Sequence, residues 1–559
     1  MNTSTIEDIG KADGLVHSDD KHEVEMLEHE HKPSDAAATA GIDMRGQELT
    51  GYEDLTLFQT LMKFKKTSLI CFAVTFSACA EGYEIGMANN INANPGFNHA
   101  IGSQVNPVDG ERILSASQLA VWTPISTTGQ VLGQVGFPFI SSWFGRKWSL
   151  FLIWLLATIA ITMQTIATKD AVWAASKIFT GMSVGALQTV VPMYVCELAP
   201  TKIRGSLISF YNFWFQLGNF FPPIVFQCLK ESGMERDWKL PIYTQWATIG
   251  VIGVVFFFAP ESPVWCAQKG KRDRGIAILT RLNGKIDGYN AEKQYDILSR
   301  SAEYEKAQNA EVRKEYWFNV FLGSNLLRLI ISTWTTLSFQ MLGLGLFLSY
   351  ASVFYTAAGV DDPFIIVIIN NCVTLGSIVP IIIFADKIGR RWVCIIGLGL
   401  MWIACLLVGI LGIVDKGKVV NALLVLFTCI WTLGLQTAAT AAYGYLAETS
   451  TQSLREYTAG WAYACSTIFG ATWGILIPYM VNEAEWNWNL KTGFFFFGVG
   501  SFFAVGAWFV LPETSKRTSA ELDELFARKI KPWRFHKTKT AIQLAAEEEK
   551  EQQREIGEI

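Results

Sequence analysis

The sequence predicts an all-α membrane protein, in which twelve transmembrane helices form two six-helix halves with short cytosolic helices between them. Three observations predict this fold class. Apolar stretches of about 20 residues, enough to cross a bilayer, recur through the middle of the chain. One polar interval, 259–326, separates the first six stretches from the last six. Short charged motifs of the first half recur in the same order in the second.

The average composition hides this membrane character. Half of the 559 residues are hydrophobic and only 17% are charged, yet the mean hydropathy is just +0.26. The segments 1–66 and 512–559 are polar and rich in charge, so they dilute the apolar middle. The formal net charge of −4, without a basic stripe, argues against a nucleic-acid partner and leaves the lipid bilayer as the expected surroundings.

The expected spans follow one another closely within each half. The first 60 residues lack an apolar core, so no cleavable signal peptide is expected before them. The twelve spans are expected at roughly 67–88, 116–141, 149–167, 171–193, 206–228, 241–258, 327–350, 363–385, 392–414, 420–445, 457–480 and 493–511.

Lysines and arginines beside the spans predict the orientation. If the spans alternate in direction, basic clusters such as 63–66, 146–147, 269–285, 387–391 and 516–517 all fall on one side. The connections on the opposite side carry few cations. Both termini are therefore expected in the cytosol.

The interval between the halves is expected to contain amphipathic helices. Ser262 before Pro263 is a favourable N-cap and first-turn pair, and Ile276, Leu279 and Leu282 give one apolar side among basic residues. A disordered linker is the alternative. The expected parts are a disordered cytosolic tail 1–66, an N-terminal half 67–258, a cytosolic linker 259–326, a C-terminal half 327–511 and a cytosolic tail 512–559.

Three pairs of motifs indicate that a six-helix unit has been duplicated. "FGRK" (144–147) and "DKIGRR" (386–391) follow the second span of each half. After the fourth spans, "ELAPTKIR" and "ETSTQSLR" each place a glutamate seven residues before an arginine. "PESPVW" (260–265) and "PETSK" (512–516) end the sixth spans. Parallel repeats of this kind are a transporter architecture.

Together with "GYEIG" (82–86) and "QMLGLGLFLSY" (340–350), these motifs resemble those of the sugar porter family of the major facilitator superfamily, especially fungal hexose and α-glucoside permeases. The resemblance extends from about residue 82 to residue 527. It implies the major facilitator fold and transport of a sugar or sugar-like molecule by alternating access, with proton symport as the expected driving mechanism.

Two charges inside spans are candidates for proton coupling, because intramembrane charges are rare and usually functional. Glu84 lies near the outer end of the first span, and Lys177 lies at a similar depth in the fourth. The resemblance implies an Asp–Arg pair at these positions, so both residues differ while both charges remain. A carboxylate that gains and loses a cationic partner can carry a proton; a static ion pair is the alternative. Glu81 is expected near the outer mouth.

A second set of charges lies at the inner ends of the spans, where the resemblance implies salt bridges that close an inner gate. Enforcing the membrane topology is a compatible role for the same charges. Ser142 stands where the motif has an aspartate, so we expect the network of the N-terminal half to be the weaker one. The residues assigned to the gate are Arg146, Glu197, Arg204, Asp386, Arg390, Arg391, Glu448 and Arg455.

Amides at mid-depth are candidates for the substrate site, because they donate and accept hydrogen bonds as vicinal hydroxyls require. The alternative is that a membrane asparagine only joins helices. Phe339 and Gly345 replace amides that the resemblance implies, which suits a less hydroxylated ligand. The candidate residues are Asn212, Asn219, Gln340, Asn371, which lies about a turn from the motif's asparagine, and Tyr443, which replaces a tryptophan.

The sequence therefore predicts a secondary transporter, most simply a proton–sugar symporter of a fungal plasma membrane. A facilitator or exporter of a sugar-derived metabolite is the first alternative, and a transporter-like nutrient sensor the second. No enzyme is expected, since no nucleophile–base set or phosphate loop is present, and no cofactor. No metal site is expected either: the ten cysteines lack ligand spacing, and the histidines at 22, 29 and 31 lie in a charged tail.

Overall fold

The computed structural model describes one compact unit of the chain, which lies within residues 50–544. The described residues are 57–91, 94–105, 112–114, 116–231, 237–286, 288–310, 316–349, 363–414, 417–451, 454–481, 486–515, 517, 519–538 and 540. The predicted tails lie outside these residues, except for 57–66 and parts of 512–540. The three tail histidines also lie outside them.

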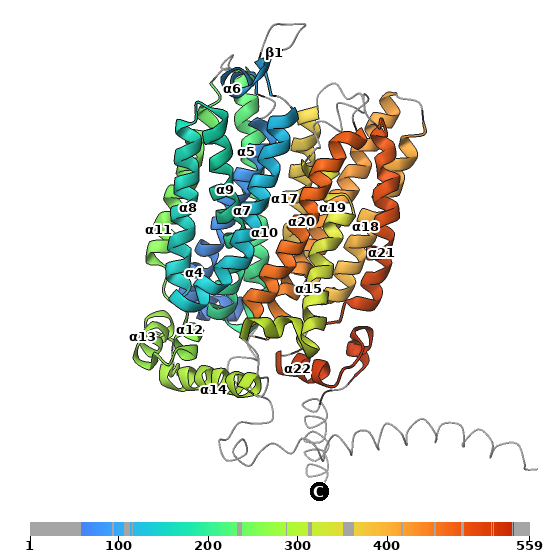
Figure 1. Ribbon diagram of the computed structural model, residues 1–559. Helices are drawn as coiled ribbons and strands as arrows, with labels where there is room; N and C mark the ends of the chain where they lie inside the picture. The colour runs from blue at the N-terminus through green and yellow to red at the C-terminus, as the bar shows by residue number, and fades with distance from the viewer. Residues whose placement is uncertain are drawn as a thin grey trace, which may run out of the picture. The chain divides into compact units, whose positions relative to one another are not determined.

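The described residues are almost entirely helical, as predicted (Figure 1). We call the first set of long helices the N-terminal half: α4 (Lys65–Thr75) with α5 (Ser77–Ile91), α7 (Ala116–Phe144), α8 (Arg146–Ile166), α9 (Asp170–Leu198), α10 (Thr201–Glu231) and α11 (Leu240–Phe258). The C-terminal half comprises α15 (Gly323–Met341) with the π-helix η2 (Gly345–Ser349), α17 (Pro363–Ile388), α18 (Arg390–Leu411), α19 (Lys418–Glu448), α20 (Arg455–Val481) and α21 (Thr492–Val510). Ten of the twelve predicted spans each overlap one of these helices, whereas 67–88 runs over α4 and α5 and 327–350 runs over α15 and η2.

Shorter elements lie at the two ends of the bundle. At one end are α6 (Pro95–Ile101) and a two-stranded antiparallel ribbon of β1 (Gln104–Val105) and β2 (Arg112–Ile113). The opposite end, which we call the basic end, carries Arg146, Arg204, Arg391 and Arg455. The remaining short elements are α3 (Leu57–Lys63), α12 (Pro263–Gln268), α13 (Arg272–Asn283), α14 (Ala291–Ala310), η1 (Tyr316–Phe321), η3 (Asn489–Lys491), α22 (Ser519–Ala527) and η4 (Pro532–Lys537).

Eight helices of the described residues are long and apolar enough to cross a membrane by length and composition. The helices α7, α10, α15 and α17 are not among these eight; in α17 a shorter apolar stretch, Ile368–Ile378, stands out. The four helices bury polar side chains inside the bundle, for example Gln134 on α7 and Asn212 on α10. For α7 and α10, these buried polar side chains account for the lower hydropathy and fit an interior position.

Large apolar side chains cover the outside of the bundle. A soluble protein would bury most such residues, whereas a membrane protein turns them to lipid. Exposed examples occur on helices of both halves and include Trp148, Phe151, Val254, Phe257, Trp392, Ile396, Phe502 and Phe509.

Glycines bring α5 and α10 into backbone contact. A Cβ atom added at Gly82 would lie 1.9 Å from the carbonyl oxygen of Phe215, and one added at Gly218 would lie 2.0 Å from that of Cys79. At Gly86, an added Cβ would lie 2.6 Å from the side-chain oxygen of Asn219. Small residues permit this approach between membrane helices. The contact fixes the position of α5 and of the carboxylates it carries.

The duplicated motifs build the same cap in both halves. Gly145 and Gly389 precede α8 and α18 with φ of 101° and 96°, a region that disfavours side chains. In the N-terminal half, Glu261 Oε1 accepts from the backbone N–H of Arg146 at 2.7 Å. In the C-terminal half, Glu513 Oε1 accepts from the backbone N–H of Arg390 at 3.1 Å. Each carboxylate thus satisfies the free N–H groups at a helix start and favours its positive dipole end.

A second feature of the duplication is a tyrosine that holds each cap in place. The hydroxyl of Tyr194 donates to the carbonyl of Pro260 at 2.8 Å. That of Tyr445 donates to the carbonyl of Pro512 at 2.7 Å. Each proline directly precedes the capping glutamate. The sequence repeat is therefore also a repeat of contacts.

The helices between the halves pack on the basic end of the N-terminal half. The Ser262 hydroxyl accepts from the backbone N–H of Trp265 at 3.2 Å, so the predicted N-cap of α12 is confirmed. The side chain of Thr67 on α4 donates to Asn283 at the end of α13 at 2.9 Å. Leu279 and Tyr295 join α13 and α14 in a small apolar cluster.

Gly145→Ala should destabilise the protein, because alanine tolerates this φ poorly and its Cβ would lie 2.4 Å from the Glu261 carboxylate. We expect the free energy of unfolding in detergent to fall by at least about 1–2 kcal/mol. Gly250→Ala is the matched control, since an added Cβ there meets no atom within 4 Å. Equal melting temperatures for the two variants would contradict the proposed constraint on Gly145.

Candidate transport site

The predicted pair of Glu84 and Lys177 forms inside the N-terminal half. Lys177 Nζ on α9 lies 3.4 Å from Glu84 Oε1 on α5, and both side chains are largely buried. Two amides complete the shell of the carboxylate: Gln164 on α8 donates to Oε1 at 2.7 Å, and Gln245 on α11 donates to Oε2 at 2.9 Å. Four helices therefore meet at this carboxylate.

An aromatic cluster covers this pair towards the α6 end. Phe97 on α6 contacts Trp173 on α9 and Trp238, with ring centroids 4.8 and 5.3 Å apart. The Lys177 ammonium lies 4.7 Å from the centroid of the Trp173 ring, a favourable cation–π distance. Lys177 thus interacts with both a carboxylate and an aromatic face.

Glu81 does not lie at a mouth of the bundle, and the prediction that it does is wrong. Its side chain is only 2% exposed. Gln188 on α9 donates to Glu81 Oε1 at 2.6 Å, and the hydroxyl of Tyr211 on α10 donates to Oε2. Because the two residues are three positions apart, Glu81 lies one helical turn from Glu84. At Glu81 the side chain is buried inside the bundle.

The Glu81 shell continues to the boundary between the halves. The Gln188 oxygen accepts from Gln130 and Gln134 on α7, at 3.2 and 2.8 Å. Gln134 also donates to the hydroxyl of Thr467 on α20 at 3.0 Å. A chain of hydrogen bonds therefore connects a carboxylate of the N-terminal half to a helix of the C-terminal half.

Two of the predicted substrate residues lie at this boundary. The Asn212 amide on α10 donates to Gln436 on α19 at 2.8 Å. The ring of Tyr443, also on α19, lies 5.9 Å from that of Tyr211, centroid to centroid. Groups from both halves thus meet here, as a site that closes around a ligand requires.

The other three predicted substrate residues lie within single halves. Asn219 packs on Gly86 of α5, and Gln340 on α15 packs on Gly470 of α20. Asn371 on α17 is buried, and its amide nitrogen has no hydrogen-bond partner. Such an unmatched donor is costly in a protein interior and suits a ligand acceptor. The described contacts do not bring these three residues together.

Several amides around these carboxylates and at the boundary between the halves were missing from the sequence prediction. The sequence could have indicated them, because each is a glutamine inside an expected apolar span, where a polar side chain needs a hydrogen-bond partner. The prediction relied on motif positions, which do not include them. They are Gln130, Gln134, Gln164, Gln188, Gln245 and Gln436.

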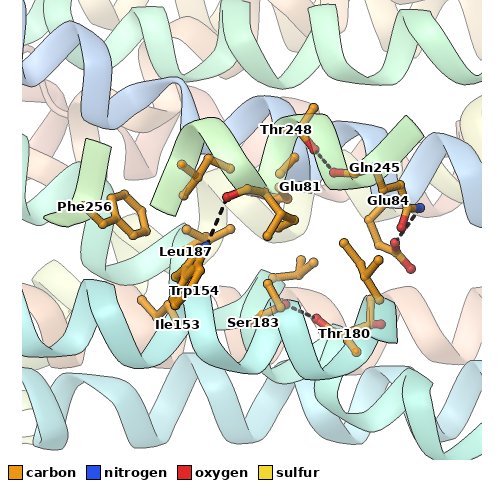
Figure 2. A pocket seen from close by; sticks show the side chains of 17 residues that line it. Glu81, Glu84, Ile153, Trp154, Thr180, Ser183, Leu187, Gln245, Thr248 and Phe256 are labelled. Atoms are coloured by element: carbon orange, nitrogen blue, oxygen red, sulfur yellow. Dashed lines mark hydrogen bonds between the residues drawn. The ribbon is translucent and has the colours of Figure 1, made fainter. Parts of the chain in front are cut away.

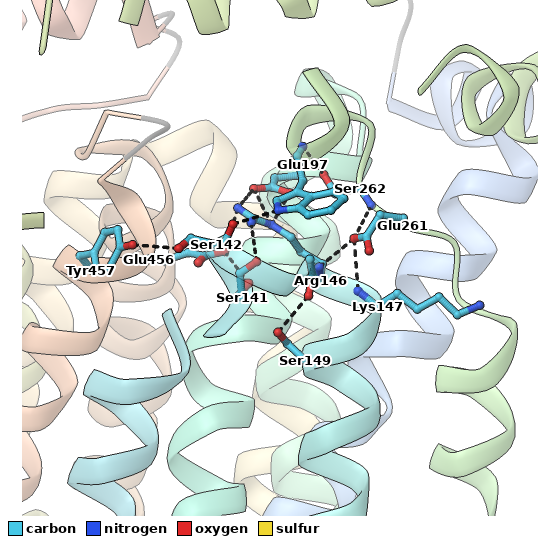
Figure 3. A network of polar contacts seen from close by, with 12 residues as sticks. Ser141, Ser142, Arg146, Lys147, Ser149, Glu197, Glu261, Ser262, Glu456 and Tyr457 are labelled. Atoms are coloured by element: carbon cyan, nitrogen blue, oxygen red, sulfur yellow. Dashed lines mark hydrogen bonds and ion pairs between the residues drawn. The ribbon is translucent and has the colours of Figure 1, made fainter. Parts of the chain in front are cut away.

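At the basic end, Arg146 forms the centre of an ion-pair network (Figure 3). Its guanidinium lies 2.6 Å from Glu197 at the end of α9 and 3.0 Å from Glu456 on α20. The hydroxyl of Ser141 donates to Glu456 at 3.1 Å. All three ion-pair partners are buried. Arg146 therefore joins the two halves, and the residue across the boundary is Glu456, which sequence reasoning missed although it follows Arg455.

The serine that replaces the motif's aspartate still contributes contacts to this network. The Ser142 hydroxyl accepts from the hydroxyl of Tyr457 on α20 at 3.1 Å, and its carbonyl accepts from the indole of Trp265 at 3.1 Å. The side chains of Asp386 and Glu448 lie outside the described residues. The expected difference in strength between the two networks therefore stays a prediction.

The remaining predicted gate arginines use other partners. Arg391 donates to the carbonyls of Trp508 and Trp533, at 2.8 and 3.2 Å. Within the described side chains, neither Arg204 nor Arg455 forms an ion pair at salt-bridge distance. The backbone of Arg390 is held by Glu513, as described above.

Known proteins resemble this chain over most of its length. The General alpha-glucoside permease of Saccharomyces cerevisiae is 26% identical, over 87% of this chain and 79% of the permease. Maltose permease MAL31 of the same species is 28% identical, over 87% of this chain and 80% of its own. The MFS transporter fmqE of Aspergillus fumigatus is 25% identical, over 93% of this chain and 98% of its own.

Solved structures share the fold. The proton:xylose symporter XylE bound to 6-bromo-6-deoxy-D-glucose aligns with a TM-score of 0.69 at 20% identity, over 84% of this chain and all of that one. The inward open conformation of XylE from E. coli aligns with a TM-score of 0.61 at 20% identity, over 82% of this chain and 99% of that one. These likenesses confirm the predicted major facilitator fold.

The family assignment rests on sequence. The profile of the family described as "Sugar (and other) transporter" matches residues 70–526, which is most of the chain. The resemblance drawn from the motifs is confirmed, and so is the prediction of a multi-pass transporter instead of an enzyme. The chain belongs to the sugar (and other) transporter family.

Proposed function

We propose that the protein is a proton-coupled symporter of a sugar or sugar-like molecule that works by alternating access. The buried pair of Glu84 and Lys177 is the observation that carries this proposal. The names of its relatives, which include permeases for α-glucosides and maltose, support a glycoside or hexose as substrate. The XylE neighbour is named as a proton symporter, which supports the coupling ion.

Glu84 can carry the proton because its shell can serve both protonation states. When ionised, the carboxylate is stabilised by Lys177 and by two amide donors. When protonated, it no longer needs the cation, and Lys177 keeps the face of Trp173 as an alternative partner. Protonation therefore weakens a bond between α5 and α9 and can shift the balance between two conformations.

The substrate is expected at the boundary between the halves, where Asn212, Gln436 and Tyr443 meet. A sugar hydroxyl can replace either partner of the amide pair, and an aromatic ring can cover the apolar face of a sugar. Asn219, Gln340 and Asn371 remain proposed contacts of the open site. In this scheme, a bound substrate replaces direct contacts between the halves with contacts between each half and the substrate.

The ion pairs at the basic end are proposed as the inner gate. Arg146 and Glu456 join the halves here, and they must separate if the site is to open at this end. We propose that this end faces the cytosol, that both termini lie there, and that the protein resides in the plasma membrane. The division into a half 67–258, a linker 259–326 and a half 327–511 is part of the same proposal.

A facilitator or exporter of a sugar-derived metabolite is the second candidate. The substituted positions Phe339, Gly345 and Tyr443 favour it, because they remove amides and an indole that the family motif supplies. A transporter-like nutrient sensor has less support, since no observation favours it specifically.

Transport by proteoliposomes separates these candidates. A counterflow panel of D-glucose, D-xylose, maltose, a polyol and a pyrone-type metabolite identifies the substrate, and an acid-outside gradient tests coupling. For Glu84→Gln, the ratio of gradient-driven accumulation to gradient-free exchange should fall at least tenfold, because the side chain no longer binds the proton. Glu292→Gln, on the exposed surface of α14, should keep the wild-type ratio. A wild-type ratio in Glu84→Gln would exclude coupling at this residue.

Removing the amide pair should weaken substrate binding. We expect Asn212→Ala and Gln436→Ala each to raise KM several-fold, corresponding to roughly 0.5–1.5 kcal/mol for one buried hydrogen bond. Because the side chains contact each other, the double variant should lose less than the sum of the two effects. Thr472→Ala, at an exposed position of α20, is the control. Unchanged KM in both single variants would remove the pair from the substrate site.

Glu456→Gln should loosen the basic end, since it removes the charge that Arg146 meets across the boundary. Buried Cys196, beside Glu197 on α9, provides a native reporter. We expect its alkylation rate by a maleimide, followed by peptide mass spectrometry, to rise several-fold. Cys394, in the core of the C-terminal half, should keep its rate. If Cys196 also keeps its rate, the charges do not gate access at this end.

A further inference from the structure

A cavity of about 30 Å³ lies in the N-terminal half, between α5, α8, α9 and α11 (Figure 2). Its wall is mainly apolar, with a few polar side chains. A single water needs roughly 10–15 Å³ of such volume and two or more polar partners, so the cavity has room for water. The polar residues that line it are Glu81, Glu84, Thr180, Ser183, Gln245 and Thr248.

One of these residues needs a partner that the protein does not supply. Gln245 is only 2% exposed, and its nitrogen is used by Glu84. Its side-chain oxygen is buried and accepts no hydrogen bond. A buried acceptor in this condition is costly, whereas a water in the cavity would donate to it. The cavity is therefore built to hold water next to Glu84.

The same cavity reaches Glu81, one turn along α5. On its other side, Glu81 accepts from Gln188 and Tyr211, and through Gln188 it connects to the boundary between the halves. Glu81 therefore contacts both the cavity and the network that leads to the proposed substrate site. Water in the cavity would link the two carboxylates.

The charges around the two carboxylates are unequal. Lys177 pairs with Glu84, while no described cation forms an ion pair with Glu81. From α8 and α11 the neighbours are the amides Gln164 and Gln245. The ionisable groups near the pair are Tyr83 on α5, Lys177 on α9, Tyr211 on α10, Tyr443 on α19 and Tyr463 on α20. Among the described residues Glu81 is thus held by neutral donors alone, so it can accept a proton without breaking an ion pair.

We propose that Glu81 and Glu84 form one proton-carrying pair, joined by water in this cavity, which passes protons between the Lys177 site and the boundary of the halves. The O–H bond of protonated Glu84 breaks as its proton joins a water, and that water releases a proton to form the O–H bond of Glu81. The water is regenerated, and ionised Glu84 pairs with Lys177. This inference rests on the proton coupling proposed above and extends it to a second carboxylate.

Infrared spectroscopy tests the link without any sugar. The full-length protein in phosphatidylcholine vesicles is titrated with acid, and difference spectra record the C=O band of each protonated carboxyl group. In the wild type we expect bands from both residues. Glu81→Gln should remove one band and shift the other, and Glu84→Gln should do the reverse. Ala160→Val, which fills the cavity from α8, should keep both bands. In this background, replacing either glutamate by glutamine should no longer shift the band of the other.

Ala247→Leu is the matched control, because Ala247 is exposed on α11 two residues from Gln245, and its spectrum should equal that of the wild type. The proposal is overturned if the Glu84 band is the same in Glu81→Gln, or if Ala160→Val keeps the mutual shifts. It is also overturned if no band depends on Glu81. Tighter binding of D-glucosamine than of D-glucose would then identify Glu81 as a site for a cationic group.

The same experiment separates this inference from the proposed symport. Mutual band shifts without acid-driven sugar accumulation would support the pair while contradicting symport. Accumulation that depends on Glu84 but is unaffected in Glu81→Gln and Ala160→Val would support symport and contradict the pair. Loss of gradient-driven accumulation at least tenfold in Glu81→Gln, relative to its own exchange rate, would support both.

Discussion

The need to give every buried charge a partner organises this protein. The hydrocarbon of the bilayer offers no hydrogen bonds, so each carboxylate, guanidinium and free helix end must find its partner within the bundle, from the protein or from water enclosed there. Glu84 gathers donors from α8, α9 and α11, and Arg146 gathers acceptors from both halves. The helices are consequently fixed by a few polar contacts, and moving a helix means exchanging those contacts.

The sequence duplication explains why the same helix cap occurs in both halves. In each half a glutamate after the sixth long helix caps the start of the third, beside a glycine with positive φ. This contact joins the end of each half to the connection between its second and third long helices. In the proposed mechanism each half moves as a unit. The contacts between the halves that must then be exchanged include the hydrogen bond of Asn212 with Gln436 and the ion pair of Arg146 with Glu456.

The fold and the Glu84–Lys177 pair could be predicted from the sequence, because apolar length and charge in a span are local signals. The place of Glu81 could not, because its depth depends on how α5 meets α10 through Gly82 and Gly218. Glu456 was missed for a related reason: it pairs with Arg146, more than 300 residues away in sequence, and no motif spacing records a contact between halves. Spacing describes one helix, whereas the site is made by several.

The two carboxylates of α5 differ in a way that suits different tasks. Glu84 has a cation and two amides, so its charged form is well supported and its partner can follow its protonation. Glu81 has neutral donors and adjoins the moving boundary, so opening the boundary would remove support that reaches it through Gln188 and Gln134. In the proposed mechanism, movement of the halves would therefore change how strongly Glu81 holds a proton. That dependence is the physical link that coupling between substrate and proton requires.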